Sequence, residues 1–96
     1  GVRETFAMFA DETAARLALF RQFEEGGDRE LIEIEACALK GSARTLGASE
    51  MSDVARLIEH RAASISADEL REAIGWLEEA NRRMRREFEA DFTQAA

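Results

Sequence analysis

The chain contains no proline and no tyrosine, and it has a single cysteine and a single histidine among its 96 residues. Without proline, no helix interior carries a residue that lacks a backbone N–H donor and clashes with the preceding turn. One cysteine cannot form an internal disulfide and gives no metal cluster. A chain of this length has no room for a second core. We therefore expect one domain over residues 1–96, without metal or cofactor.

Long apolar runs and an excess of positive charge are also missing. No run of about 18 apolar residues is present, so no segment is expected to span a membrane. No signal-peptide pattern opens the chain, which favours a cytoplasmic location. The net charge of -7 argues against nucleic acid as the main partner, because phosphate backbones need a basic surface. A local exception, which we interpret as the charged face near the end of a helix, is the run of Arg82, Arg83, Arg85 and Arg86.

The residues that dominate the sequence (Ala, Leu, Glu and Arg) are strong helix formers, and their pattern predicts four helices and no strand. The first is expected from about Val2 to Glu25, ending at Gly26-Gly27 because glycine suits the left-handed end of a helix. Its apolar stripe consists of Phe6, Phe9, Leu17 and Phe20. The second helix is expected to begin at the N-cap residue Asp28. Its core stripe consists of Ile32, Ala36, Leu39, Ala43 and Leu46.

Gly47 lets the chain turn, and Ser49 is predicted to cap a third helix. The apolar face of that helix consists of Met51, Val54, Ala55, Ile58 and Ala62. The segment Ser66-Ala67-Asp68-Glu69 reads as a capping box for a fourth helix, with Ile65 packing onto Leu70. The stripe of this helix consists of Leu70, Ile74, Leu77, Asn81, Met84, Phe88 and Phe92, and Trp76 flanks it as a core-edge residue.

All three connections are short, so neighbouring helices are expected to be antiparallel. The predicted fold is all-α, an antiparallel up-down-up-down four-helix bundle. A bundle with one filled core can be monomeric, and we expect a monomer. No constellation of acid, base and nucleophile is evident, so an enzyme is not expected.

Cys37 is predicted to face solvent. A helix turns about 100° per residue, which places Cys37 about 140° from the core stripe of the second helix. On the same geometry it lies in a row with Glu33, Gly41 and Arg44, and beside Lys40. A glycine inside a helix costs roughly 0.5–1 kcal/mol relative to alanine. Because no core packing demands a small residue at Gly41, we interpret it as space for a partner to reach position 37.

The segment Ala36-Cys37-Ala38-Leu39-Lys40-Gly41-Ser42-Ala43, closed by Leu46-Gly47-Ala48, resembles the signature of histidine-containing phosphotransfer (HPt) domains. That signature reads roughly Ala-His-x-Leu-Lys-Gly-Ser-Ala…Leu-Gly-Ala, so Cys37 stands where the family carries its phosphoacceptor histidine. Further matches to the family pattern are Phe9, Glu12, Leu17, Gly27-Asp28 and Ile58-Glu59.

The resemblance implies a four-helix bundle that exchanges phosphoryl groups with receiver-domain aspartates or histidine kinases, the receiver supplying Mg²⁺. It also implies that Lys40 offsets the charge of the phosphoryl group and that Gly41 gives access. Cys37 has no imidazole nitrogen. Our leading interpretation is a docking module for a response-regulator receiver domain or a histidine kinase, which carries no phosphate. Its partner-binding residues would be Glu33, Lys40, Gly41 and Arg44, around the phosphoacceptor-equivalent Cys37.

Three alternatives stay open. The chain could be an ordinary phosphotransfer protein in which cysteine replaces histidine by engineering or divergence. Cys37 could be a redox-sensing thiol, with its thiolate favoured by Lys40 and Arg44 and opposed by Glu33. A phosphocysteine is chemically conceivable, because a thiolate is nucleophilic. The only histidine, His60, is expected to be exposed on the third helix, and we interpret it as an ordinary surface residue because no Lys-Gly pair follows it.

Overall fold

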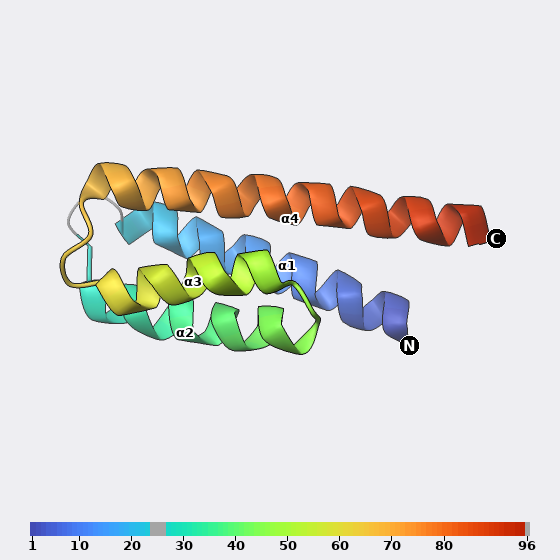
Figure 1. The fold of residues 1–96 in the computed structure, drawn as a ribbon, viewed down its shortest axis with the longest axis horizontal. Coiled ribbons are helices and arrows are strands. Elements are labelled where there is room, and N and C mark those ends of the chain that lie inside the picture. Colours follow the sequence, from blue (N-terminus) through green and yellow to red (C-terminus); the bar gives the residue numbers. More distant parts are fainter. Residues whose placement is uncertain (24–26, 96) are drawn as a thin grey trace.

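A computed structural model of the chain describes residues 1–23 and 27–95, with side chains up to residue 91. It contains four helices: α1 (Val2–Phe23), α2 (Arg29–Thr45), α3 (Ser49–Arg61) and α4 (Ala67–Ala95). The helices run up, down, up and down, with α1 beside α4 and α2 beside α3 (Figure 1). No strand occurs in the described residues. The predicted all-α four-helix bundle is confirmed, whereas the predicted helix end at Glu25 and Gly26 lies outside the described residues.

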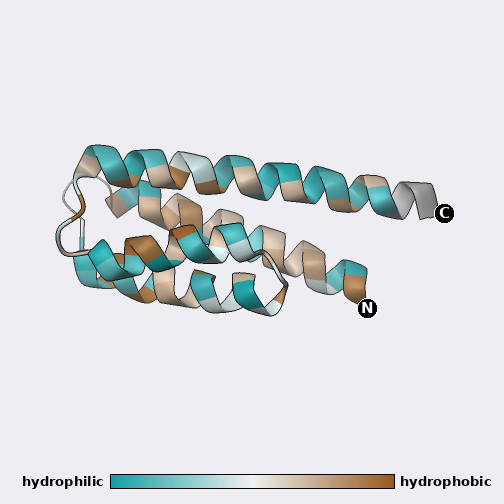
Figure 2. Cartoon of the chain, viewed as in Figure 1, coloured by the Kyte–Doolittle hydropathy of each residue, from teal (hydrophilic) through white to brown (hydrophobic). Residues whose placement is uncertain are grey.

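The core follows the predicted stripes. Buried apolar side chains from all four helices form one cluster. Apolar residues alternate with polar ones along the helices of the ribbon (Figure 2). In α2, the four residues Ile32, Ala36, Leu39 and Ala43 have no exposed surface. The polar interruption in the α4 stripe, Asn81, is also buried, and its Nδ2 donates to the Ala10 carbonyl oxygen of α1 at 3.1 Å. The side chain of Phe92 lies outside those that the structure describes.

One predicted core residue is exposed. Leu46 retains 36% of its surface, because α2 ends at Thr45 and Leu46 is its C-cap. The next residue, Gly47, has a φ of 77°, a left-handed conformation that turns the chain away from the helix axis. The three-and-four spacing of the stripe therefore continues one step beyond the helix that it describes.

The helix caps agree with the sequence in two cases and differ in one. The Asp28 carboxylate caps α2 by accepting from the backbone N–H of Glu30 at 2.9 Å. The Ser66 hydroxyl caps α4 by accepting from the Glu69 N–H at 3.0 Å. Ser49 is not a cap, so that prediction is wrong. The N-cap of α3 is Ala48, which makes no side-chain cap bond.

The physical reason lies in the turn between α2 and α3. The Ala48 N–H donates to the Ala43 carbonyl at 2.8 Å and the Gly47 N–H donates to the Arg44 carbonyl at 3.1 Å. These bonds close the end of α2 in the manner of a Schellman motif. They leave Ala48 as the junction between the two helices, so that Ser49 is already helical. The turn thus holds α2 and α3 as a tight antiparallel hairpin.

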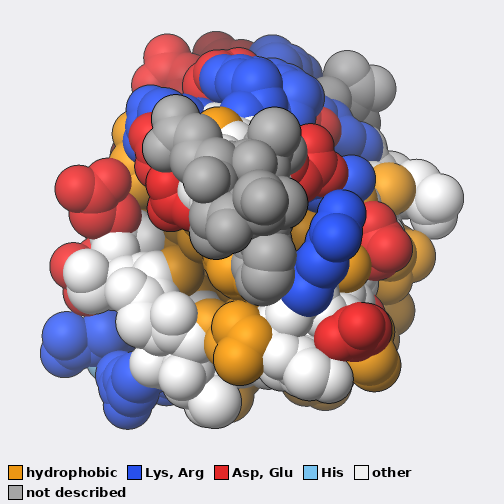
Figure 3. Space-filling model, turned by 90° about the vertical axis from the view of Figure 1, so that its right-hand side faces the viewer, with side chains coloured by type: hydrophobic (Ala, Val, Ile, Leu, Met, Phe, Trp, Pro, Cys, Tyr) orange, Lys and Arg blue, Asp and Glu red, His pale blue; other side chains and the backbone are white. Residues whose placement is uncertain are grey.

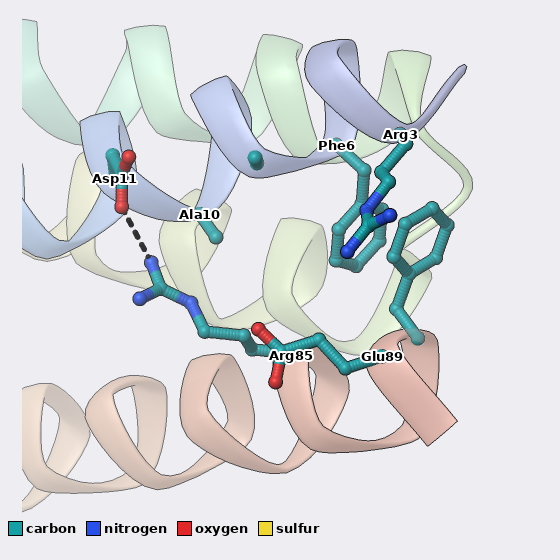
Figure 4. Close-up of a pocket in the computed structure, with 8 residues that line it drawn as sticks. Arg3, Phe6, Ala10, Asp11, Arg85 and Glu89 are labelled. Carbon is teal, nitrogen blue, oxygen red and sulfur yellow. Dashed lines mark hydrogen bonds and ion pairs between the residues drawn. The ribbon is translucent and has the colours of Figure 1, made fainter. Parts of the chain in front are cut away.

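The outer helices are longer than this hairpin and extend past it toward the chain ends (Figure 1). At that end the rings of Phe6 and Phe88 stack, with centroids 3.7 Å apart and planes 4° from parallel. Apolar side chains there lie among charged ones (Figure 3). Close by, the Arg85 guanidinium pairs with the Asp11 carboxylate at 2.8 Å across a pocket between α1 and α4 (Figure 4).

The arginines of α4 behave as a charged helical face. Arg82 and Arg86 both pair with the Glu79 carboxylate, at 3.0 and 3.4 Å, and Arg85 pairs with Asp11. These ion pairs lie on the surface, where each contributes little to stability. Within the described part of the chain, none of the helices combines the length and the apolar character that crossing a membrane needs.

Candidate functional site

The outer face of the α2–α3 hairpin carries the residues that the sequence singles out. Cys37 is exposed, as predicted, and so are Glu33, Gly41 and Arg44 on the same side of α2. Lys40 is half-buried, because its side chain turns from α2 toward α3. The structure therefore brings all five predicted residues onto one surface, with Cys37 near its centre.

Gly41 leaves this surface bare one turn beyond Cys37. A Cβ built at Gly41 has no neighbouring atom within 4 Å, so packing does not require a glycine there. Its backbone does not require one either, because the only described glycine with a positive φ is Gly47. The missing side chain thus opens space without answering any local structural need.

A residue that the sequence analysis did not place in the site, Glu59 of α3, connects the two helices at its centre. Lys40 Nζ donates to Glu59 Oε1 at 2.7 Å, and the two side chains are only 22% and 16% exposed. The Cys37 thiol lies close enough to the Glu59 carboxylate for each group to shift the pKa of the other. A further bond, from the Ser52 hydroxyl to the Lys40 carbonyl at 3.2 Å, holds α3 against α2. Glu59 is therefore the shared partner of both the cysteine and the lysine.

The electrostatics of the thiol follow from this carboxylate. The pKa of Cys37 is raised, first because the thiol donates a hydrogen bond to Glu59 and then because the negative charge of Glu59 opposes the thiolate. Lys40 acts in the opposite sense but with a smaller effect, and Glu33 adds slightly to the rise. The expectation that nearby cations favour the thiolate is therefore wrong on balance. The thiol is held in its protonated, weakly nucleophilic form.

The same contacts act on Glu59 in the other direction. The pKa of the Glu59 carboxyl is lowered, mainly by its hydrogen bond from Lys40 and then by the bond from Cys37. A lowered carboxyl pKa means that the ionised form is the one the folded state stabilises. At neutral pH the centre of the site is thus a Lys40–Glu59 ion pair with a neutral thiol attached.

His60 lies beside this cluster. Its imidazole is exposed, as predicted, with 61% of the side-chain surface accessible, and Nε2 lies 3.9 Å from Glu59 Oε1. That oxygen is the one that accepts from Lys40. A helical wheel of α3 alone places His60 away from the core but cannot show which residues of α2 it approaches. No group of three or more metal-ligating side chains that could hold an ion lies within residues 1–23 and 27–91.

The comparison with known families agrees with the motif. The family model described as "Hpt domain" matches residues 4–94, which is nearly the whole chain. No curated protein and no solved structure matches the chain significantly. Hpt domains take part in phosphorelay phosphotransfer in two-component signalling, where they generally interact with receiver domains or histidine kinases. The extent of the match, together with the four-helix bundle, shows that the chain belongs to the Hpt domain family.

Proposed function

We propose that this Hpt domain docks a receiver domain or a histidine kinase on the outer face of α2 and α3, and that Cys37 does not carry the phosphoryl group. In this proposal Cys37 occupies the place of the phosphoacceptor histidine of the family. Glu33, Lys40, Gly41 and Arg44 surround it as partner-binding residues. The observation that carries the proposal is an open, bare surface with a protonated thiol at its centre.

The chemistry of the thiol supports the second half of the proposal. Phosphoryl transfer depends on a positioned nucleophile and on positive charge near the phosphoryl oxygens. The Glu59 carboxylate raises the pKa of the Cys37 thiol, which keeps the sulfur protonated and weakly nucleophilic. The nearest cation, Lys40, is already paired with that carboxylate at 2.7 Å. Position 37 therefore holds a weakly nucleophilic thiol beside a lysine that is already ion-paired.

The composition of the surface supports docking. On α2, the apolar side chain of Ile34 is 60% exposed and lies one turn before Cys37, on the same side of the helix. Exposed apolar residues rimmed by charged ones are typical of protein interfaces. Charged residues at the rim include Glu33, Arg44 and Arg56. A partner helix could bury the apolar residues while its backbone approaches Gly41.

Binding to purified receiver domains tests the docking face. Receivers encoded in the source genome are titrated against the chain by calorimetry, with and without acetyl phosphate and Mg²⁺. We expect at least one to bind, and we expect Ile34→Asp to abolish that binding. The matched control is Leu19→Asp, which places the same charge at an exposed leucine of α1, outside the α2–α3 face. If no receiver or kinase binds the chain, the docking proposal is refuted.

A second candidate is an ordinary phosphotransfer protein in which cysteine has replaced the histidine. The observation in its favour is that the surroundings of position 37 are intact, with Lys40 and Glu59 paired and Gly41 bare. In that case Cys37→His gains an acid-labile phosphoryl group from a phosphorylated receiver. A Cys37→His variant that folds, binds the receiver and stays unlabelled excludes this candidate.

A further inference from the structure

We propose that His60 of α3 accepts the phosphoryl group in place of residue 37. This inference rests on the proposed docking of a phosphorylated receiver to the α2–α3 face. Two observations carry it: the position of the imidazole at the edge of that face, and an exposed arginine in the groove beside it.

The imidazole of His60 lies next to the carboxylate of Glu59, and that carboxylate also contacts residues of the docking face. Glu59 Oε1 accepts from Lys40 Nζ at 2.7 Å and lies 3.9 Å from His60 Nε2. The same carboxylate holds the Cys37 thiol. The only imidazole of the chain thus lies one side chain away from the residue that stands in the phosphoacceptor position. At 3.9 Å, His60 Nε2 lies beyond hydrogen-bond distance of Glu59 Oε1.

The groove beside His60 offers charge for phosphoryl oxygens. It has a volume of about 490 Å³ and is lined by Asp53, Arg56, Leu57, His60 and Arg61. Arg56 lies one helical turn before His60, on the same side of α3. Its guanidinium is exposed and forms no ion pair with any side chain that the structure describes. A free guanidinium can bind two phosphoryl oxygens at once, which is why arginine is frequent at phosphate sites.

The other charges near the groove partly cancel. Arg61 is paired with Glu69 at 3.1 Å, and the carboxylate of Glu59 is paired with Lys40. Asp53 lies three residues before Arg56 and is exposed. Arg56 is consequently the cation best placed to stabilise a phosphoryl group on the imidazole.

The transfer step balances with an aspartyl phosphate as donor. The lone pair on the unprotonated ring nitrogen of His60 attacks phosphorus, and an N–P bond forms. The P–O bond to the donor aspartate breaks, and the electron pair leaves with the aspartate carboxylate. The proton on the other ring nitrogen stays in place, so no additional base is needed. The donor receiver supplies the Mg²⁺ that offsets charge on the phosphoryl oxygens.

The experiment is phosphoryl transfer from a receiver that binds the chain. The receiver is labelled with acetyl [³²P]phosphate and Mg²⁺, freed of excess donor and mixed with the chain. We expect an acid-labile, alkali-stable label that mass spectrometry locates on His60. In the His60→Gln variant the label falls to background, whereas Cys37→Ser still becomes labelled. Arg56→Gln slows transfer by about tenfold or more, since it removes a charge that stabilises the transition state. The matched control is Arg82→Gln on α4, which keeps the parent rate.

Each result decides between the two proposals. A label on Cys37, or a label that persists in His60→Gln, overturns the role of His60. Receiver binding without any transfer also overturns it but leaves the docking proposal intact. Absence of receiver binding removes both. Circular dichroism of His60→Gln establishes that a loss of label comes from the missing imidazole, because an exposed residue with no buried contacts is not expected to affect folding.

Discussion

Replacing Gly41 by alanine should raise the stability of the domain and weaken its binding to a receiver domain. Gly41 lies within α2, has no positive φ, and has open space where a Cβ would stand. An alanine there introduces no clash inside the chain. Its methyl group does, however, project from the proposed docking face, one turn beyond Cys37. The two effects of the substitution can therefore be measured separately.

The expected gain in stability follows from helix propensity. Alanine in place of glycine in a helix interior stabilises by roughly 0.5–1 kcal/mol, chiefly because the unfolded chain loses freedom. For a domain of this size, 1 kcal/mol corresponds to about 4–8 °C in Tm. We expect Gly41→Ala to raise Tm by about 2–8 °C. An unwanted methyl group in a packed contact costs about 1–3 kcal/mol, so affinity for a receiver should fall at least about fivefold.

Thermal unfolding by circular dichroism and calorimetric titration of a receiver measure the two effects. Gly75→Ala on α4 is the matched control, because its Cβ would meet only Arg21 Nη2 at 3.7 Å, an ordinary contact. It should raise Tm similarly and leave receiver binding unchanged. Gly47→Ala provides the opposite case. Its φ of 77° should make an alanine destabilising by about 1 kcal/mol.

Two results would refute this reasoning. A fall in Tm for Gly41→Ala would mean that the glycine serves the backbone or the packing of α2. A rise in Tm with undiminished receiver affinity would mean that partners do not approach this part of α2. In the second case Gly41 would be a tolerated helical glycine, and the docking surface would have to lie elsewhere on the hairpin.

Other substitutions test the contact between Glu59 and Cys37 and the packing of the hydrophobic core. Glu59→Gln should lower the pKa of the Cys37 thiol. Iodoacetamide should therefore alkylate the variant faster than the parent at neutral pH. Equal rates would argue that Glu59 does not set the pKa of the thiol. The lowered pKa of Glu59 stabilises the fold above the ordinary value of 4.5, and that contribution is lost as pH falls through the folded pKa. Glu59→Gln should accordingly lose less stability than the parent on acidification, as urea unfolding at several pH values would show. Leu39→Ala, at a fully buried position, should cost about 2–5 kcal/mol in urea unfolding, and a smaller loss would indicate that the core collapses around the gap.

The fold could be predicted from the sequence because each helix carries its own signal. The four buried α2 residues repeat at four and three residues, and the Asp28 and Ser66 caps mark where two helices begin. The two errors both fall at the α2–α3 turn. Backbone bonds and the left-handed Gly47 decide where α2 ends, and a spacing pattern contains neither. A spacing pattern alone therefore places Leu46 in the core and assigns the capping role to Ser49.

The site could be predicted only in part, for a related reason. Periodicity within α2 correctly places Cys37 and Gly41 on the outside, because that requires the geometry of one helix only. The pairing of Lys40 with Glu59 joins residues 19 positions apart on two helices. It depends on the axial register of α2 against α3, which the stripe of neither helix specifies. The sign of the effect on the Cys37 thiol was wrong because the dominant charge comes from the other helix.

The contacts that fix the axial register of α2 against α3 affect the interpretation of every test at position 37. The Ser52 hydroxyl binds the Lys40 carbonyl, and the Lys40 ammonium binds Glu59, so α3 is held against α2 by groups other than residue 37. Cys37 is exposed and contributes nothing to the buried core. Replacing it by serine or histidine should therefore change the chemistry at the surface without moving the helices that form it. A Cys37→His variant that folds and binds the receiver but accepts no phosphoryl group would then report on the chemistry of position 37 and not on a displaced helix, and it would exclude the ordinary phosphotransfer protein.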